Sequence, residues 1–373
     1  MPCTSTRGRC PFRKWSGTSI DQGERLQAGV REAFSRGNPL RIQGGGSKPF
    51  FGRKTEACTV LDLSAHQGIA AYEPQELFVT ARAGTPLAVL EAVLRESGQF
   101  LPFEPPHWGP GATLGGTLAC GLSGPARAHA GAARDFVLGV RMLNGQGQLL
   151  RFGGQVMKNV AGYDVPRLLV GSLGTLGVLL EATLKVLPAP RASRTRRLEL
   201  DAAAALRFCR RLAAQPLPVS ATCHDGKKSL FVRFSGNGSA VRAAVARTGG
   251  DALEETEAEA LWRTVREQEH PFFAGGEPLW RLSLPPAAPL LLPEYPGLVE
   301  WGGAQRWLRG NPGVTRVQEA AAAHGGHAVL FRGDPGGMRF HPLSPVQLRL
   351  HQRLKAAFDP GSILNRGRMY PDF

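Results

Sequence analysis

The sequence predicts an α+β protein with two domains, and three observations carry this prediction. The chain has 373 residues, which is more than one hydrophobic core usually organises. Three glycine-rich loops, each next to a predicted strand, all lie before residue 190. A segment rich in proline and arginine, residues 188–197, follows them and is typical of a linker. We expect a disordered tail at residues 1–19 and a first domain at residues 20–190. A smaller second domain is expected at residues 191–345, and a last helix with its tail at residues 346–373.

Hydrophobic periodicity and turn residues locate the elements of the first domain. Apolar residues at helical spacing predict a helix over residues 24–34. Pro86 begins a second helix, residues 87–96, and Gly98 follows its end. Asn144 and Gly145 predict a hairpin turn. Apolar and β-branched segments predict strands at residues 39–42, 57–63, 76–81, 136–143, 148–152 and 178–187.

The second domain alternates strand-like segments with alanine-rich helical segments, which indicates a smaller α+β unit. Its predicted strands are residues 196–200, 218–222, 230–234 and 328–331. Its predicted helices are residues 202–214, 239–247 and 254–266, and a last helix is predicted at residues 345–358.

Composition limits the classes of function. The net charge of +15 favours anionic partners, such as a nucleotide cofactor, a carboxylate substrate, membrane lipid or an acidic protein. A proteome that prefers arginine explains the same charge equally well. The six cysteines form no C-x-x-C pair, so we expect no iron–sulfur centre and a reducing compartment. No apolar run approaches the roughly 20 residues of a membrane span, and residues 1–19 contain no apolar signal segment.

The first glycine loop follows a predicted strand and consists of Gly44, Gly45, Gly46, Ser47 and Lys48. Glycine adopts positive φ freely and has no Cβ that would keep a ligand away from the backbone. The loop therefore offers consecutive N–H groups, a hydroxyl and an exposed ammonium group to one anion. A diphosphate requires donors of this kind.

Two further glycine loops follow. The second, residues 109–124, adds the hydroxyl groups of Thr113, Thr117 and Ser123, and the third, residues 171–177, has a glycine at every third position. A single glycine turn at a strand end is common, but three in one domain favour nucleotide binding. The Rossmann fold is excluded, because the third loop leads into a strand and not into a helix.

The order of the motifs resembles that of the vanillyl-alcohol-oxidase type (PCMH-type) flavoprotein family. The motifs are Gly-Gly-Gly-Ser at 44–47, Ala-Thr-Leu-Gly-Gly-Thr at 112–117, Arg-Asp-Phe-Val-Leu-Gly at 134–139, Lys-Asn-Val-Ala-Gly-Tyr-Asp at 158–164 and Gly-Ser-Leu-Gly-Thr-Leu-Gly at 171–177. The resemblance extends from about residue 40 to residue 188 and returns at residues 358–365. Within the family, the chain is most similar to the smaller FAD-binding subunits of glycolate oxidases.

This resemblance implies a PCMH-type FAD-binding domain of two subdomains, followed by a smaller α+β cap domain, with the C-terminal tail returning to the flavin. It implies that residues 44–48 and 113–117 hold the FAD diphosphate, that residues 135–139 lie near the adenine, and that Asn365 closes over the isoalloxazine. The cofactor-binding residues that it implies are Gly44, Gly45, Gly46, Ser47, Lys48, Thr113, Leu114, Gly115, Gly116, Thr117, Ser123, Asp135, Gly139, Gly177, Val178 and Asn365.

Three positions depart from the family pattern. Gly46 stands where relatives with covalently bound flavin carry histidine, so we expect noncovalent FAD. Leu173 replaces a common glutamate and Arg366 a common proline, both close to the expected flavin.

Few residues are candidates for substrate chemistry. Oxidation of a 2-hydroxy acid at a flavin needs a base for the hydroxyl proton and a cation for the carboxylate. Lys158 and Tyr163 are weak candidates for the flavin rim, and a loop ion pair beside a buried tyrosine is the alternative. His324 and His327 are also weak candidates, because they flank two glycines without a carboxylate partner. We expect no metal site.

The resemblance implies an FAD-dependent oxidoreductase that acts on the CH–OH group of a 2-hydroxy acid as part of a complex. The implied partners are a larger FAD-binding glycolate oxidase subunit and an iron–sulfur subunit that receives the electrons. The implied location is the cytoplasm, with attachment to the inner face of the membrane through the complex left open. Two alternatives remain: a self-sufficient 2-hydroxy-acid dehydrogenase and, more distantly, a basic nucleic-acid-binding protein.

Overall fold

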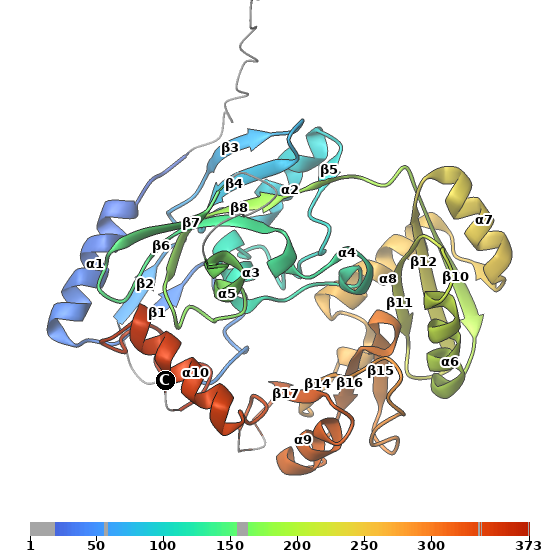
Figure 1. Ribbon diagram of the computed structural model, residues 1–373. Coiled ribbons are helices and arrows are strands. Elements are labelled where there is room, and N and C mark those ends of the chain that lie inside the picture. Colours follow the sequence, from blue (N-terminus) through green and yellow to red (C-terminus); the bar gives the residue numbers. More distant parts are fainter. Residues whose placement is uncertain (1–18, 56–58, 155–162, 335, 337, 372) are drawn as a thin grey trace, which may run out of the picture.

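The computed structural model describes residues 19–55, 59–154, 163–334, 336, 338–371 and 373. Within these residues the strands form a five-stranded sheet, an eight-stranded sheet and two smaller pairs (Figure 1). This mixture of helices and largely antiparallel sheets confirms the predicted α+β class. The tail expected at residues 1–19 lies outside the described residues except for Ser19.

A parallel pair of strands begins the fold. β1 (Leu40–Gln43) pairs with β2 (Thr59–Asp62), and α1 (Gly23–Arg36) packs its apolar face into the same core. β1 also pairs with the C-terminal tail, because the N–H of Leu40 donates to the carbonyl of Ile363 and the N–H of Asn365 donates to the carbonyl of Leu40. The C-terminal tail therefore returns to β1, close to α1 (Figure 1).

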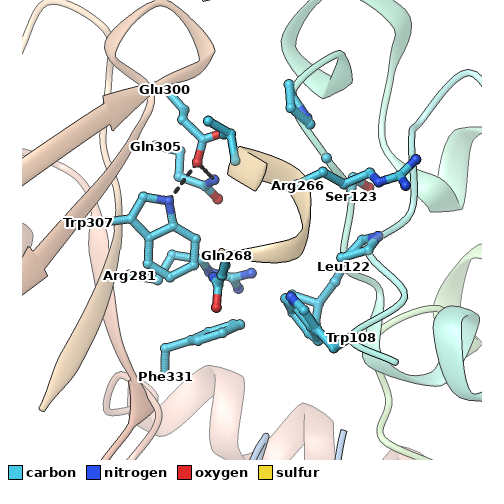
Figure 2. Close-up of a pocket in the computed structure, with 14 residues that line it drawn as sticks. Trp108, Leu122, Ser123, Arg266, Gln268, Arg281, Glu300, Gln305, Trp307 and Phe331 are labelled. Carbon is cyan, nitrogen blue, oxygen red and sulfur yellow. Dashed lines mark hydrogen bonds between the residues drawn. The ribbon is translucent and has the colours of Figure 1, made fainter. Parts of the chain in front are cut away.

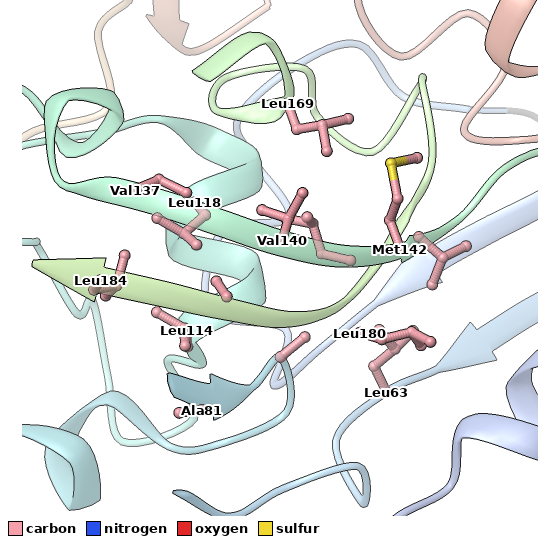
Figure 3. Close-up of a cluster of buried hydrophobic side chains, with 14 of the residues drawn as sticks. Leu63, Ala81, Leu114, Leu118, Val137, Val140, Met142, Leu169, Leu180 and Leu184 are labelled. Atoms are coloured by element: carbon pink, nitrogen blue, oxygen red, sulfur yellow. The ribbon is translucent and has the colours of Figure 1, made fainter. Parts of the chain in front are cut away.

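The five-stranded sheet is antiparallel and has the order β3-β4-β8-β6-β7. Leu114 and Leu118 pack beneath β6 and β8, where Val140 and Leu184 belong to the same buried cluster (Figure 3). The elements of this part are β3 (Ile69–Glu73), β4 (Phe78–Arg82), β6 (Val137–Leu143), β7 (Leu149–Gly153), β8 (Val178–Lys185), α2 (Leu87–Glu96), α3 (Leu114–Cys120), α4 (Arg127–Ala130) and α5 (Val165–Leu169).

The helix α3 lies within the second glycine loop, where the sequence predicted no helix. Thr113 caps it by accepting a hydrogen bond from the N–H of Gly116 at 3.3 Å, and Gly121 ends it with a φ of 62°. Glycine and threonine have low helix propensity, so the local pattern did not indicate a helix. Burial of Leu114 and Leu118 against the sheet offsets this propensity.

The chain crosses to the second sheet between β9 (Leu187–Pro188), which pairs with β5 (Gln99–Phe100), and β10 (Ala192–Glu199). The eight-stranded sheet is antiparallel in the order β13-β10-β12-β11-β15-β16-β14-β17. Its other strands are β11 (Val219–His224), β12 (Ser229–Gly236), β13 (Asp251–Ala252), β14 (Leu279–Ser283), β15 (Gly297–Glu300), β16 (Gln305–Arg309) and β17 (His327–Arg332). The helices of this part are α6 (Ala202–Ala213), α7 (Gly238–Thr248), α8 (Glu255–Glu267) and α9 (Val314–Ala322).

The basic segment that we expected to be a linker, residues 191–197, is mostly strand β10, so this prediction was wrong. β10 pairs with β12 along its whole length, and its buried Thr195 accepts a hydrogen bond from the indole of Trp262 at 2.9 Å. Arginine side chains reach solvent from a strand on long apolar stems, so a run of charge does not prevent pairing. The strands β14 and β16 were not predicted from the sequence, because arginines interrupt their apolar pattern as well.

The last helix, α10 (Pro345–Phe358), has the predicted bounds, and Ser344 and Gln347 form a capping box at its start. Near its end the ammonium group of Lys355 is buried and lies 2.6 Å from the carboxylate of Asp359. The same ammonium group donates to the carbonyls of Thr175 and Leu364, each at 2.8 Å. This buried ion pair therefore joins α10 to the third glycine loop and to the tail.

Candidate functional site

A cavity of about 490 Å³ lies where the end of β1, the first turn of α3, the third glycine loop and the C-terminal tail meet. It brings together most of the residues predicted to bind the cofactor, from four separate parts of the chain. These residues are Gly44, Gly45, Gly46, Ser47, Lys48, Thr113, Gly115, Gly116, Gly177 and Asn365.

The first glycine loop presents backbone donors to this cavity. Among the described residues, no hydrogen bond is donated by the N–H of Gly44, Gly45, Gly46 or Ser47. Gly46 has a φ of 69°, and a Cβ there would meet only the Gln43 amide at 3.8 Å. A group of adjacent unpaired N–H donors is the usual binding site for an oxyanion. The loop therefore has the donors that a diphosphate requires.

Lys48 is 8% exposed, so the expectation of an exposed charge was wrong. Its ammonium group donates to the hydroxyl of Ser47 at 3.1 Å and to the carbonyl of His107 at 3.2 Å, and it lies 5.5 Å from the centre of the Trp108 ring. Burial lowers the pKa of Lys48. The loop that carries His107 and Trp108 covers this lysine, and no local sequence pattern shows such a contact.

The first turn of α3 forms the next part of the wall. A Cβ at Gly116 would meet only the hydroxyl of Thr113, at 3.2 Å, so the cavity extends to the backbone there. Leu114 and Thr117 do not line the cavity. Leu114 is fully buried in the core, and the buried hydroxyl of Thr117 has no partner among the described residues.

Asn365 connects the opposite walls of the cavity. Its Oδ1 accepts a hydrogen bond from the N–H of Ile42 at 2.8 Å, and its Nδ2 donates to the carbonyl of Leu173 at 2.6 Å. The Asn365 amide therefore links β1 to the third glycine loop. That Asn365 closes over the isoalloxazine remains a prediction.

The charges around the cavity suit a dianion. Arg41, Lys48, Lys54 and Arg368 line it, and no aspartate or glutamate does so within the described part of the chain. Arg368 is also structural, because it donates to the carbonyl of Phe51 at 2.7 Å and holds the segment after the first glycine loop in place. Cations without neighbouring carboxylates, beside unpaired N–H groups, fit a diphosphate.

Four other residues that were expected at the cofactor lie away from this cavity. Ser123 lines a second, smaller cavity, and its hydroxyl accepts a hydrogen bond from the N–H of Ala133 at 3.1 Å. The carboxylate of Asp135 accepts from the N–H of Ala132 at 2.9 Å. Gly139 belongs to β6, and Val178 is fully buried in the core.

The weak catalytic candidates are not brought together. Lys158 lies outside the described residues, and the side chain of Tyr163 is 91% exposed. His324 is exposed in the turn that follows α9, and His327 is exposed at the start of β17, an edge strand of the eight-stranded sheet. Among the described residues, no group of three His, Cys, Asp or Glu side chains could hold a metal ion.

Several residues of the cavity were not predicted. Some of them lie inside the predicted glycine loops but were not named as cofactor-binding residues, and others lie just beyond the ends of those loops. Arg368 could not have been predicted from these loops, because it lies in the tail beyond any recognised motif. The unpredicted lining residues include Arg41, Gln43, Lys54, Thr55, Cys120, Ser172, Leu173, Gly174, Leu179 and Arg368.

Comparison with known proteins identifies the family. Residues 20–153 match the FAD binding domain family. The chain is 47% identical to glycolate oxidase subunit GlcE of Escherichia coli over 354 residues, which are 94% of this chain and 98% of that protein. The chain belongs to the GlcE family. FAD is therefore the cofactor of this GlcE-family chain, and the cavity with its free N–H groups and cations fits that cofactor.

More distant relatives share only part of this GlcE-family chain. Glycolate oxidase subunit GlcD of Bacillus subtilis is 33% identical over 38% of this chain and 30% of its own length. A mitochondrial D-lactate dehydrogenase [cytochrome] of Arabidopsis thaliana is 34% identical over 36% of this chain and 23% of its own length. Among solved structures, alkyldihydroxyacetonephosphate synthase matches the fold with a TM-score of 0.66 at 15% identity, covering 92% of this chain and 75% of that one.

No helix among the described residues is both long enough and apolar enough to cross a membrane.

Proposed function

We propose that this chain is the FAD-binding subunit of a glycolate oxidase complex and that its flavin passes electrons from 2-hydroxy-acid oxidation to an iron–sulfur partner. The chain is an FAD-dependent oxidoreductase of the GlcE family. The observation that carries the proposal is the match to GlcE along almost the whole of both chains, together with a cavity suited to FAD.

Within the cavity we assign the FAD diphosphate to the unpaired N–H groups of Gly44–Ser47 and to the ammonium group of Lys48. Gly116 would allow the cofactor to lie against the backbone of α3. FAD, when bound, supplies a two-electron acceptor. The residues of the chain bind it, neutralise its charge and limit what can approach it.

A cluster of aromatic rings fills the space between the first glycine loop and the eight-stranded sheet. We call Phe50, Phe51, Trp108, Trp307 and Phe331 the interdomain aromatic cluster. The ring centres of Trp307 and Phe331 are 4.9 Å apart, those of Phe51 and Phe331 5.3 Å, and those of Phe50 and Trp108 5.3 Å. The cluster adjoins the cofactor cavity through Lys48, which lies over the Trp108 ring.

This packing favours a role in electron transfer within a complex. It does not favour the alternative, a self-sufficient dehydrogenase. A substrate on this side of the cavity would have to displace rings that are packed against one another. The second cavity, which lies beyond Trp108, measures only about 20 Å³, room for little more than one water molecule. Electrons that reach this flavin from another subunit need no such space.

The partners in this proposal are a larger FAD-binding subunit, which oxidises the hydroxy acid, and an iron–sulfur subunit. The cytoplasm is the proposed location. Cys209 and Cys223 are buried free thiols, which accords with a reducing compartment.

Co-purification tests the proposal. The chain, expressed from its native locus with a small affinity tag, should retain FAD and bring with it a second flavoprotein and an iron–sulfur protein, identified by mass spectrometry. The complex should oxidise glycolate. Isolation of the chain without these partners, in a preparation where glycolate oxidation elutes elsewhere, would contradict the proposal.

A further inference from the structure

The smaller cavity lies between the eight-stranded sheet, the end of α8 and the loops at residues 106–108 and 122–125, and it collects polar groups that have no partner among the described residues (Figure 2). Three buried side-chain atoms that line it make no hydrogen bond within the described part of the chain. These atoms are the indole Nε1 of Trp108, the amide Oε1 of Gln268 and the guanidinium Nε of Arg281. Buried polar atoms are normally paired, so three at one small cavity indicate a missing partner.

Arg281 is the charged member of this group. No ion pair or hydrogen bond from its guanidinium occurs within the described residues, and its contacts there are the ring faces of Phe51 at 5.8 Å and Phe331 at 5.7 Å. Burial lowers the pKa of Arg281 to about 10, so the group remains a cation at neutral pH. The side chain as a whole is only partly buried, but its Nε is shielded from solvent, and a shielded cationic donor without an acceptor is unfavourable.

The carboxylates near the cavity are already engaged. The side chain of Glu300 lines the cavity but accepts hydrogen bonds from the indole of Trp307 at 2.6 Å and from the amide of Gln305 at 2.9 Å. Glu267 pairs with Arg266 at 2.7 Å and also accepts the backbone N–H of Trp108. Neither forms an ion pair with Arg281, so the space beside its Nε is open to an acceptor from outside the chain.

We propose that this cavity binds a small monovalent anion between Arg281 of β14 and the indole N–H of Trp108. Figure 2 shows Arg281 and Gln268 on one side of the space and Trp108 on the other. About 20 Å³ admits a group of roughly the size of one water molecule, such as a halide or the head of a carboxylate. The unpaired Oε1 of Gln268 is an acceptor, and rotation of the amide by 180° would exchange it for the NH₂ group, which can donate to such an anion.

The site joins the two parts of the molecule, because Trp108 belongs to the flavin-binding part and Arg281 to the eight-stranded sheet. A bound anion therefore stabilises the contact between them. This inference does not depend on the substrate or the partners of the proposed function.

Formate is the appropriate probe, since it is the smallest carboxylate. We would measure its binding to the full-length FAD-loaded chain by calorimetry and by the unfolding temperature, with ionic strength held constant by methanesulfonate, a larger anion. We expect saturable binding and a rise in the unfolding temperature. Arg281→Met should weaken binding by about 10- to 100-fold, since it removes a charged hydrogen-bond donor.

The matched control is Arg332→Met. Arg332 also lies over rings of the interdomain aromatic cluster, at 5.0 Å from the centre of Phe50, but it does not line the cavity, so formate binding should not change. Trp108→Phe keeps the ring and removes only the N–H, and we expect about 3- to 10-fold weaker binding. It also provides a test if Arg281→Met does not fold.

Chloride and glycolate, each used in place of formate, identify the source of the anion. Equal binding of chloride and formate supports an inorganic ion, and preference for formate or glycolate supports a carboxylate ligand. If none of the three binds saturably, or if both Arg281→Met and Trp108→Phe bind formate as tightly as the unaltered chain, the proposal is overturned.

Discussion

At the residue scale, the glycines of the cavity have two different roles. A Cβ at Gly45 would overlap the carbonyl of Gly111, so Gly45 allows the first two glycine loops to pack together. Gly46 and Gly116 line the cavity itself: a Cβ at Gly46 would meet only the Gln43 amide at 3.8 Å, and one at Gly116 would press only on the Thr113 hydroxyl at 3.2 Å. A substitution at Gly45 therefore tests the fold, whereas one at Gly116 tests the ligand.

We predict that Gly116→Val lowers FAD occupancy without unfolding the chain. The new Cβ presses only on the hydroxyl of Thr113, at 3.2 Å, and the methyl groups beyond it extend into space that the cofactor needs. The measurement is the ratio of flavin to protein absorbance after gel filtration, with circular dichroism to check folding. Gly276→Val, at a position in the second domain with no heavy atom within 4 Å, is the control and should keep full occupancy. Normal occupancy in Gly116→Val would place the cofactor elsewhere.

We also predict that FAD is bound noncovalently, because Gly46 has no side chain that could form a bond to the flavin. Acid precipitation should leave all of the flavin in the supernatant, where its absorbance can be measured. Flavin that stays in the pellet after washing would contradict this prediction.

Glu300 should make stability depend on pH. Burial raises the pKa of Glu300 to about 7, despite the hydrogen bonds from Trp307 and Gln305. Between its ordinary value of 4.5 and about 7, the folded protein holds a proton that the unfolded chain has lost, so stability falls as pH rises through this range. The loss reaches about 3 kcal/mol at most.

The free energy of unfolding, measured with denaturant between pH 4.5 and pH 8, tests the predicted pH dependence of Glu300. Glu300→Gln keeps an oxygen that can accept both hydrogen bonds and removes the ionisation, so its free energy of unfolding should lack this fall. Parallel pH profiles for the two proteins would show that Glu300 does not titrate in this range.

At the scale of elements, α10 determines where the tail and the third glycine loop lie. Lys355 is the contact that holds them, since its ammonium group touches Asp359 and the carbonyls of Thr175 and Leu364. We predict that Lys355→Met lowers the free energy of unfolding by about 3–5 kcal/mol, because it leaves a buried carboxylate without its cation. It should also weaken FAD binding, since Asn365 follows directly after this contact.

The unfolding temperature without FAD measures the loss of stability in Lys355→Met, and its rise on addition of FAD measures the change in FAD binding. The exposed Lys228 supplies the control, and Lys228→Met should change the unfolding temperature little. An unchanged unfolding temperature in Lys355→Met would mean that α10 is held by its apolar contacts alone.

At the scale of the whole molecule, the two sheets meet through specific polar contacts as well as the interdomain aromatic cluster. Arg233 pairs with Glu104 at 2.7 Å, and the indole of Trp301 donates to the carbonyl of Gly124 at 3.1 Å. These contacts join the eight-stranded sheet and the η3 turn (Trp301–Gly303) to the segments at residues 104 and 124, near the two ends of the second glycine loop.

We predict that the isolated FAD-loaded chain is not reduced by glycolate within seconds, although dithionite reduces it. The packed rings of the interdomain aromatic cluster leave no room for a substrate and a general base beside the first glycine loop, and loss of a general base alone slows such reactions by about 10²–10⁴-fold. Anaerobic stopped-flow measurement of the flavin absorbance decides this. Addition of the larger flavin subunit should restore reduction, and rapid bleaching of the isolated chain would show that it oxidises glycolate itself.

The sequence by itself determined the α+β class, the last helix and the three glycine loops, and its resemblance to a flavoprotein family indicated the cofactor. These features depend on local rules: glycine allows close approach of a ligand, and the spacing of apolar residues sets helix or strand. The tertiary structure alone decided that α3 forms within a glycine loop, that a run of arginines pairs as β10, and that Lys48 is buried. It also decided that Arg281 and Trp108 face one cavity, because such contacts join residues far apart in the sequence and leave no local pattern.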